Sequence, residues 1–535
     1  MSSLLILIIG VVVVIGMIIF LRVNAFIALI TAAMIVSLLS PGPLADKMSR
    51  VGTAFGSVVG SIGIVIALAA VIGKCLMDSG AADRIVRAFL KVLGEKRSPW
   101  ALMGSGFVLS VPVFFDTVFY LLVPLARSLY KRTQKNYMVY LMAICGGACI
   151  THTLVPPTPG PLFIASEFGI DLGLMILMGV LVGLPTAAVA MLVCRLINRF
   201  QNIPMRPYGG EPESEPLSDK ELPPLWLSLL PVVLPVILIS TNTIANVFAR
   251  AEHFKRISSG IVNAQIVDDD EKVGKLAQKF INAKILYNPG NADDLATEIQ
   301  DAKIKVEDYD TLTLAQIFIN ADILGDGKET GPAQKAADVT AVLGSPNLAL
   351  FLSAVIAMSL VVWKRKISLR DLTKSVDQSL MSGGIIILIT AGGGAFGAML
   401  REAGIQNDIE NYFAYSGQSI SLMIFLAAFL VAALLKFAQG SSTVAMITTS
   451  SMFAAMEIPT EVLGCNYVYL ALAIGGGSLV GSWMNDSGFW IVARMGVLTE
   501  KEALKSWTIL LAVLGTTSFL ITLLLSRVMP LLPNV

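Results

Sequence analysis

The chain has 535 residues, of which 55% are hydrophobic and only 14% are charged, and its formal net charge is +1. A soluble globular domain carries about 25% charged residues, so the composition excludes an ordinary soluble domain and places most of the chain in lipid. The small net charge also argues against a nucleic-acid partner, which would need a basic face.

Apolar runs long enough to span a bilayer, which takes about 20 residues, occur along most of the chain. The first run, residues 3–20, has no preceding Lys or Arg and no small-residue cleavage site after it, so we interpret it as a membrane helix and not a secretory signal. The predicted spans are 3–20, 24–40, 57–77, 137–162, 170–196, 225–248, 346–363, 382–400, 466–496 and 507–527.

Two further apolar stretches, 100–127 and 420–454, are predicted to be re-entrant hairpins. Basic residues flank the first stretch on both sides, at 84–97 and at 127–135. Because positive charge collects on the cytoplasmic side, both ends of this stretch are expected there. Irregular backbone at a hairpin tip, predicted here at Phe115–Thr117, is tolerated in a membrane only where it lines a cavity.

The sequence also repeats itself at a shift of 324 residues. Residues 62–89 align without gaps on 386–413 with seven identities, and the same shift places the first hairpin tip on Gln439–Ser441. The loop after 57–77 is basic, whereas the loop after 382–400 is acidic. The two copies are therefore expected to cross the membrane in opposite directions, an arrangement typical of transporters with a site near the midplane.

These patterns predict an all-α polytopic membrane protein. It would contain two inverted repeats, each with a re-entrant hairpin and a broken helix, and a small helical extracytoplasmic insert. The predicted parts are a first transmembrane repeat at 1–200, a cytoplasmic linker at 201–224, the first helix of the second repeat at 225–248, a soluble helical insert at 249–342 and the remainder of the second repeat at 343–535.

The predicted insert carries 11 Lys and Arg against 16 Asp and Glu, and a short internal repeat pairs 276–286 with 314–324. The run that begins at Asp322 resembles a calcium loop. However, Leu324 and Ala333 stand where a calcium loop needs oxygen ligands, so we favour a helix-ending turn and expect no metal or other cofactor.

Asp116 and His152 are the ionisable residues of interest in the first half. A carboxylate in an apolar run is expensive to insert, so Asp116 is a functional candidate; the alternative is an Asp that only caps the hairpin tip. Four prolines between 156 and 161 must break the helix that carries His152. Its imidazole suits proton transfer, although a structural histidine is the alternative.

Polar residues cluster at the corresponding places of the second half. Gln439 and the hydroxyls that follow it suit a carboxylate or polyol, and Lys436 would either neutralise an anion or extend its amine outward. Small residues near 475–478 suit close helix packing, but Asn485 and Asp486 are harder to explain that way.

Four motifs carry a resemblance: FFDTVFYLLVPLAR, THTLVPPTPGP, KFAQGSSTVA and MNDSGFW. In this order they resemble the gluconate permease family of bacterial symporters, within the wider ion transporter superfamily, over most of 1–248 and 343–535. The chain departs from that family in its insert, in Lys436 where Arg is expected, and in Thr158 where His is usual.

The resemblance implies an inner-membrane, multi-pass secondary transporter that imports gluconate or a related small hydroxycarboxylate with protons by alternating access. The candidates for substrate binding are Thr117, His152, Thr158, Gln439, Gly440, Ser441, Ser442, Thr443, Asn485 and Ser487. The candidates for proton coupling are Asp116, His152 and Asp486.

Three alternatives stay open at this point. Broken helices with Asp, Asn and Ser also bind Na⁺, so sodium coupling is the main rival. A sensor that uses the 249–342 insert would lack a cytoplasmic output domain. No nucleophile–base pair, HExxH or P-loop pattern is visible, so we expect no enzyme. The expected partners are a small anion, protons and the lipid bilayer, and a homo-oligomer is left open.

Overall fold

The computed structural model describes residues 3–21, 23–207, 219, 221–263, 332–404, 420–484 and 486–531, with short stretches between 272 and 318. The secondary structure of these residues is helical, and no β-strand occurs among them. The chain divides into two compact units. The first is Met1–Ile237 with Pro346–Pro530, and the second is Leu238–Ser345 with Leu531–Val535.

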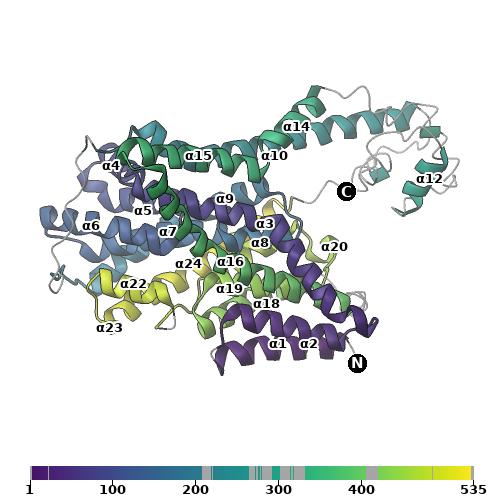
Figure 1. Ribbon diagram of the computed structural model, residues 1–535, viewed down its shortest axis with the longest axis horizontal. Helices are drawn as coiled ribbons and strands as arrows, with labels where there is room; N and C mark the ends of the chain where they lie inside the picture. The colour runs from purple at the N-terminus through teal and green to yellow at the C-terminus, as the bar shows by residue number, and fades with distance from the viewer. Residues whose placement is uncertain are drawn as a thin grey trace. The chain divides into compact units, whose positions relative to one another are not determined.

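The first unit contains most helices of both predicted repeats (Figure 1). Those before the linker are α1 (Ser3–Ile19), α2 (Ala25–Leu39), α3 (Lys47–Asp78), α4 (Ala81–Leu93), α5 (Ser98–Leu109), α6 (Phe115–Thr133), α7 (Tyr137–Leu154), α8 (Pro159–Glu167) and α9 (Leu172–Phe200). Those after residue 345 are α15 (Pro346–Arg365), α16 (Leu369–Glu402), α18 (Ile420–Gln439), α19 (Ser442–Ala454), α20 (Thr460–Leu463), α21 (Tyr467–Gly477), α22 (Ser487–Met495), α23 (Glu500–Ala503), the π-helical η3 (Leu504–Thr508) and α24 (Ile509–Val528).

Helix α10 (Leu225–Asn263) begins in the first unit and continues into the second, which also holds α12 (Ala292–Asp301) and α14 (Pro332–Leu343). Asn242 of α10 accepts a hydrogen bond from the hydroxyl of Thr340 on α14 at 3.3 Å. The calcium-like run that begins at Asp322 and most of the short internal repeat lie outside the described residues.

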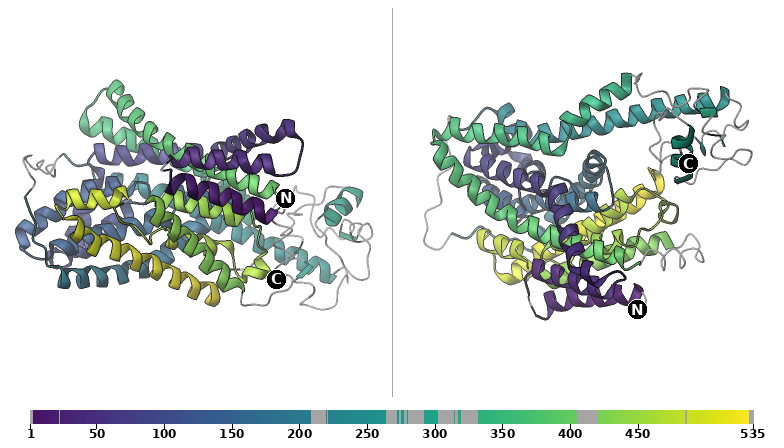
Figure 2. Two further views of the ribbon diagram at one scale, coloured as in Figure 1. Left: turned by 90° about the horizontal axis from the view of Figure 1, so that it is seen from below. Right: turned by 45° about the vertical axis from the view of Figure 1, so that its right-hand side comes forward.

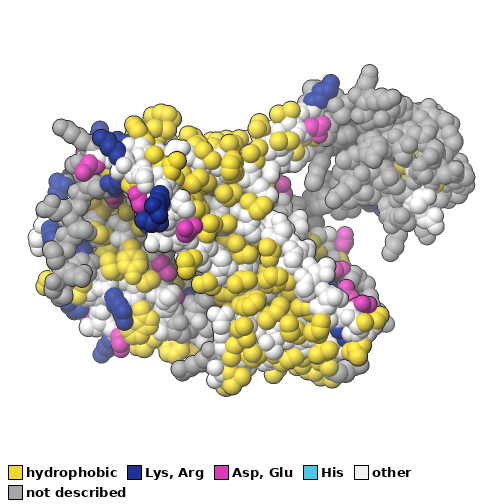
Figure 3. All heavy atoms as spheres, in the orientation of Figure 1, with side chains coloured by type: hydrophobic (Ala, Val, Ile, Leu, Met, Phe, Trp, Pro, Cys, Tyr) yellow, Lys and Arg dark blue, Asp and Glu magenta, His cyan; other side chains and the backbone are white. Residues whose placement is uncertain are grey.

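Helix length and composition agree with a membrane location. Eight of the described helical segments are long and apolar enough to cross a bilayer. On α9, exposed leucines recur at helical spacing at Leu177, Leu181, Leu184 and Leu192, which gives this helix an apolar outer face. On the face of the first unit drawn in Figure 3, hydrophobic side chains cover the middle, and most Lys and Arg gather at the end that holds α4, α6 and α23.

Several helices are longer than the predicted spans. Helix α3 starts ten residues before the predicted 57–77, and α16 starts 13 residues before the predicted 382–400. At a rise of 1.5 Å per residue, these two helices are each about 50 Å long, well beyond a hydrocarbon core of about 30 Å. Their polar first turns therefore extend beyond the apolar layer, and composition alone does not place such turns in a helix.

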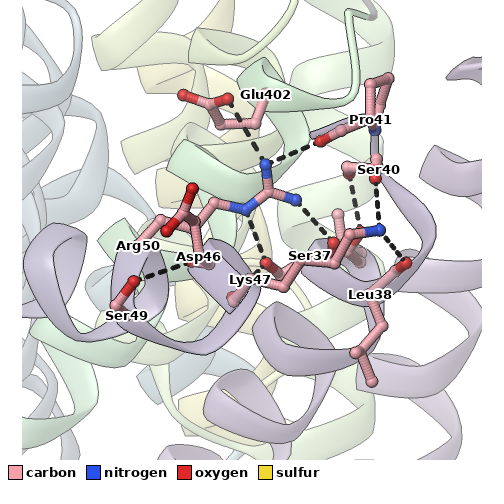
Figure 4. Close-up of polar contacts among 10 residues, drawn as sticks. Ser37, Leu38, Ser40, Pro41, Asp46, Lys47, Ser49, Arg50 and Glu402 are labelled. Atoms are coloured by element: carbon pink, nitrogen blue, oxygen red, sulfur yellow. Dashed lines mark hydrogen bonds and ion pairs between the residues drawn. The ribbon is translucent and has the colours of Figure 1, made fainter. Parts of the chain in front are cut away.

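The corner between α2 and α3 is held by two basic side chains (Figure 4). Lys47 Nζ donates to the carbonyl of Leu38 at 2.6 Å. Arg50 donates to the carbonyl of Ser37 at 2.6 Å and lies 3.6 Å from the carboxylate of Glu402, at the end of α16. The last carbonyls of a helix have no partner within it, so these side chains complete the end of α2.

The opposite end of α3 meets the start of α16. The Asp78 carboxylate accepts a hydrogen bond from the Ser375 hydroxyl at 2.5 Å and lies 2.7 Å from Lys74 Nζ. Arg365 of α15 donates to the Asp78 carbonyl at 2.6 Å. Polar contacts therefore tie α3 to α16 at both ends, and the two helices pack against each other between them.

Small residues allow the remaining helices of the first unit to pack closely, as is common in membranes. A methyl group added to Gly147 on α7 would collide with the Met103 carbonyl on α5. Helices from opposite ends of the sequence also touch, since α24 packs on α7 and α9 and α22 packs on α6. Figure 2 shows these late helices, in yellow, among the blue helices of the first half.

Candidate functional site

Four helix interruptions in the first unit lie around one cavity of about 590 Å³. They lie between α5 and α6, between α7 and α8, between α18 and α19, and between α21 and α22. Residues of three interruptions line this cavity directly, and the end of α7, just before the remaining interruption, lines it through His152 and Thr153. Each interruption leaves backbone groups without helical partners, so polar atoms are available in an otherwise apolar interior. The site is built from three of these breaks and from the end of α7.

The first break differs in position from the predicted hairpin tip. The turn between α5 and α6 occupies residues 110–114, and the predicted tip at Phe115–Thr117 is instead the first turn of α6. Asp116 and Thr117 of that turn line the cavity. The Asp116 carboxylate does not cap the helix, and it makes no hydrogen bond or ion pair with any residue that the structure describes.

The prolines after His152 break the second helix as predicted. Helix α7 ends at Leu154 and α8 starts at Pro159; the Pro156–Pro157 bond between them is cis. His152 lines the cavity, and its Nδ1 atom is buried without a hydrogen-bond partner in the described part of the chain.

Thr158 is not among the residues that line this cavity. Its hydroxyl donates to the Val155 carbonyl at 2.7 Å inside the second break, and its side chain is buried. The contact satisfies one of the carbonyls that the prolines leave open.

The third break falls at Gly440, as predicted. Gly440 has φ +82°, a conformation that favours glycine, and Ser441 caps α19 by accepting from Val444 N–H at 3.3 Å. Ser442 donates to the Ser478 carbonyl at 2.8 Å, which joins the third break to the fourth. The Gln439 amide lines the cavity with its Nε2 buried and unpartnered among the described residues.

The fourth break, between α21 and α22, ends at Asp486. Its Oδ1 accepts from Gly488 N–H at 2.9 Å and caps α22, while its Oδ2 accepts from Lys436 at 2.6 Å and also from the Ser482 hydroxyl. Ser482 accepts in turn from the Trp507 indole at 2.7 Å. Asn485, a predicted substrate-binding residue, lies outside the described residues.

Lys436 does not extend outward, so that interpretation is wrong. Its side chain is 3% exposed and donates to the Gly440 carbonyl at 2.6 Å as well as to Asp486. The ammonium thereby connects the third break with the fourth. Each charge of this buried pair is compensated by the other, which a charge in such surroundings requires.

The structure brings most of the predicted residues into one place. Asp116, Thr117, His152, Gln439, Gly440, Ser441, Ser442, Thr443, Asp486 and Ser487 all line the cavity. It also adds residues that the sequence did not indicate, among them Phe114, Cys149, Thr153, Ser382, Ile386 and Trp507.

The local sequence marks Trp507 only as an aromatic residue in an apolar span and does not indicate that it lines the cavity. It lies in the π-helical turn η3, a feature that often occurs at functional sites. The centroid of its ring lies 5.1 Å from the ring centroid of Phe115 on α6. Its contact partners come from distant parts of the chain, so no sequence signal marks them.

Fold and cavity together define a class, namely a multi-pass helical membrane protein with a polar site between broken helices. The family model described as GntP family permease matches residues 2–266 and 327–528. The chain belongs to this family and is a membrane transporter, which confirms the resemblance seen in the motifs. Residues 267–326, between the two matched parts, fall inside the predicted insert.

Individual relatives in the same family are similar in sequence to this protein over nearly the whole chain. An uncharacterized permease of Haemophilus influenzae is 30% identical over 91% of this chain and 85% of its own length. A gluconate permease of Pseudomonas aeruginosa is 29% identical over 95% and 94%, respectively. The inner membrane permease YgbN of Escherichia coli is 27% identical over 96% of each chain. The protein described here is likewise a multi-pass inner-membrane protein.

Among solved structures, the YdaH transporter of Alcanivorax borkumensis is similar with a TM-score of 0.54 and 11% identity. The similarity covers 95% of this chain and 98% of that one. At this identity the likeness concerns the fold alone, and it agrees with the all-helical architecture.

Proposed function

We propose that this permease imports gluconate or a related small hydroxycarboxylate together with protons, by alternating access. The observation that carries the proposal is the cavity between the four helix breaks. It combines three adjacent hydroxyl side chains, two buried nitrogen atoms without partners in the described structure, and a carboxylate without a counter-ion there. Buried polar groups are normally hydrogen-bonded, so the two nitrogens are suited to a ligand.

The hydroxyl-rich wall suits the polar substrate. Ser441, Ser442 and Thr443 follow the Gly440 turn at the start of α19, where helix N–H groups favour an anion. The substrate carboxylate would rest there. Gln439 Nε2 and His152 Nδ1 would bind its hydroxyls, and we keep Asn485 as a further candidate for this role.

Among the three candidates for the coupled proton, the contacts favour Asp116. Asp486 already has Lys436, Ser482 and the Gly488 N–H as partners, so an added proton would disrupt a complete network. The charges of Lys436 and Asp486 cancel. An ionised Asp116 would therefore repel the substrate carboxylate, and a protonated one would not. His152 would contact the substrate.

Helix positions support the inverted repeat on which alternating access would rest. A shift of 324 residues moves α2 onto α15 and α3 onto α16. The same shift brings Asp78, the last residue of α3, onto Glu402, the last residue of α16. The Asp78 carboxylate contacts Ser375 near the start of α16, and the Glu402 carboxylate contacts Arg50 near the start of α3. The first half contributes α6 and α7 to the cavity, and the second contributes α16, α18, α19, α22, η3 and α24.

The proposed orientation follows the basic residues. Arg84 and Arg87 of α4 contact Asp219 of the linker, and Arg206 contacts Glu502 of α23. We place these residues, the 201–224 linker and the ends of α3 and α22 on the cytoplasmic side, because positive charge collects there. The 249–342 insert would then lie outside the cytoplasm.

The substrate class is taken from relatives. The Pseudomonas aeruginosa relative is named a gluconate permease, and it matches 95% of this chain. A gluconate-like anion fits the cavity because a carboxylate and several hydroxyls are the groups that its polar side chains can bind.

Gluconate uptake into proteoliposomes with an imposed proton gradient and no sodium tests the proposal. We expect accumulation that collapses when a protonophore is added. Uptake that needs sodium would replace the proton with Na⁺ as the coupling ion. Failure under both conditions would exclude gluconate, and a panel of small hydroxy acids would then be assayed.

A further inference from the structure

A second cavity of about 280 Å³ adjoins the first. Phe114, Thr117 and Ser382 line both cavities, so these three residues form the boundary between them. The remaining lining comes from α3, from the turn between α5 and α6, and from α16: Ala69, Ala70, Gly73, Lys74, Met77, Pro112, Val113, Gln378 and Ser379.

Lys74 is the cation of this second cavity. Its ammonium lies 2.7 Å from Asp78 one helical turn away, and its side chain is 36% exposed. A pair of this kind, at i and i+4 on a partly exposed helix face, stabilises a helix only weakly. Lys74 can therefore leave Asp78 at small cost.

Asp78 would remain well partnered without Lys74. Its other carboxylate oxygen accepts from Ser375 at 2.5 Å, and its backbone carbonyl accepts from Arg365. Lys436 in the first cavity is the opposite case, because it is buried and bound to Asp486 and Gly440. Of the two lysines, Lys74 is the one available to an incoming anion.

The remaining polar side chains suit the same ligand. Gln378 is exposed and lies one helical turn from Ser382, and Ser379 is next to it in sequence. Together with Thr117 they continue the series of hydroxyl and amide groups from the first cavity toward Lys74. A hydroxylated anion that leaves the first cavity along this path would exchange one set of hydrogen bonds for another.

We propose that the second cavity is a separate binding subsite for the substrate anion, on the cytoplasmic side of the main site. Lys74 would bind the carboxylate, and Gln378 and Ser382 would bind hydroxyl groups. The inference rests on the proposed function, since it takes the ligand class and the orientation from it. It assigns a substrate-binding role to α3, a helix that contributes no residue to the first cavity.

The test compares Lys74→Gln with Lys374→Gln in right-side-out and inverted membrane vesicles, with labelled gluconate as the substrate. Lys374 is the control because it also pairs with an aspartate on its own helix, Asp371, at 3.2 Å. It lies near the start of α16 and lines neither cavity. For Lys74→Gln we expect the ratio of the cytoplasmic-side KM to the outer-side KM to rise about tenfold, the effect of losing one charge-assisted hydrogen bond.

Lys374→Gln should leave the ratio unchanged, and Lys74→Arg should restore most of it. Gln378→Ala, at an exposed position, gives an independent variant that should raise the same ratio. An unchanged ratio in Lys74→Gln and Gln378→Ala would overturn the subsite. Absence of gluconate transport by the unmodified protein would instead refute the proposed substrate, so the two failures are distinguishable.

Discussion

Asp116 and Asp486 both face the central cavity, but only Asp486 has a counter-ion in the described structure. Asp116→Asn would imitate the protonated acid permanently. We expect this variant to lose accumulation driven by a proton gradient while it still exchanges labelled for unlabelled substrate. Its KM should not change with pH. The KM of the unmodified protein should rise with pH, because deprotonation of Asp116 adds a negative charge beside the substrate.

Asp171→Asn is the control for this experiment. Asp171 caps α9 by accepting from Leu174 N–H at 2.9 Å, and Asn caps a helix about as well as Asp. This substitution therefore removes a carboxylate charge and keeps the cap of α9. If Asp116→Asn still accumulates substrate against a gradient, Asp116 does not carry the proton.

The buried pair of Lys436 and Asp486 supports the third and fourth breaks, and a double-mutant cycle measures its contribution. Lys436→Met and Asp486→Asn should each lower the free energy of unfolding by about 3–5 kcal/mol, because each leaves one buried polar partner uncompensated. The double variant should lose less than the sum of the two, by about 0.5–3 kcal/mol. Chemical denaturation of the purified protein in detergent gives these values, and additive losses would contradict the pairing.

At the residue scale, the sequence identifies candidate site residues because they are unusual in an apolar segment. Asp116 and His152 stand out because ionisable groups are rare in apolar spans, and both line the cavity. The partner of Lys436 could not be predicted in the same way, since 50 residues separate it from Asp486. Ser382 is an ordinary residue of a helix, and only the packing of α16 brings it to the site.

At the level of whole helices, stability depends on how closely the backbones of neighbouring helices approach each other. Helices α5 and α7 meet at Gly147, where an added methyl group would collide with the Met103 backbone carbonyl. Gly147→Ala should therefore force the helices apart and destabilise the protein by about 1–3 kcal/mol. Gly56→Ala on α3, where the added methyl group meets nothing within 4 Å, should be neutral or slightly stabilising.

Thermal unfolding of the two purified variants distinguishes these outcomes. Equal melting temperatures for Gly147→Ala and Gly56→Ala would mean that the close approach of α5 and α7 does not limit stability. The comparison is informative because both substitutions make the same chemical change in a helix interior.

The helix breaks were predicted more accurately than the helix ends. Pro156 and Pro157 cannot continue α7, which stops at Leu154, whereas Pro159 and Pro161 lie in the first turn of α8. Gly440 marks the third break through its left-handed conformation. The first tip was placed too late by a few residues, because nothing in the local sequence prevents Phe115 from starting α6. The polar first turns of α3 and α16 were missed for a similar reason, since apolar length was the signal used.

The whole molecule combines a family-like membrane part with a segment that the family model does not match. All residues that line the central cavity lie in the first unit, and residues 267–326 lie in the second. Composition and hydropathy therefore predicted the membrane part well. The acidic, weakly patterned insert gave no comparable signal for its structure or its role.

Replacement of residues 267–326 by a Gly/Ser linker of about 10 residues tests how far transport depends on the insert. Because the cavity and its four helix breaks are formed without these residues, we expect the shortened protein to transport substrate with an unchanged KM. Protein amount in the membrane must be measured in parallel, so that a change in expression is not mistaken for a change in activity. A raised KM at equal protein amount would show that the insert takes part in substrate capture, and it would extend the transport pathway into the second unit.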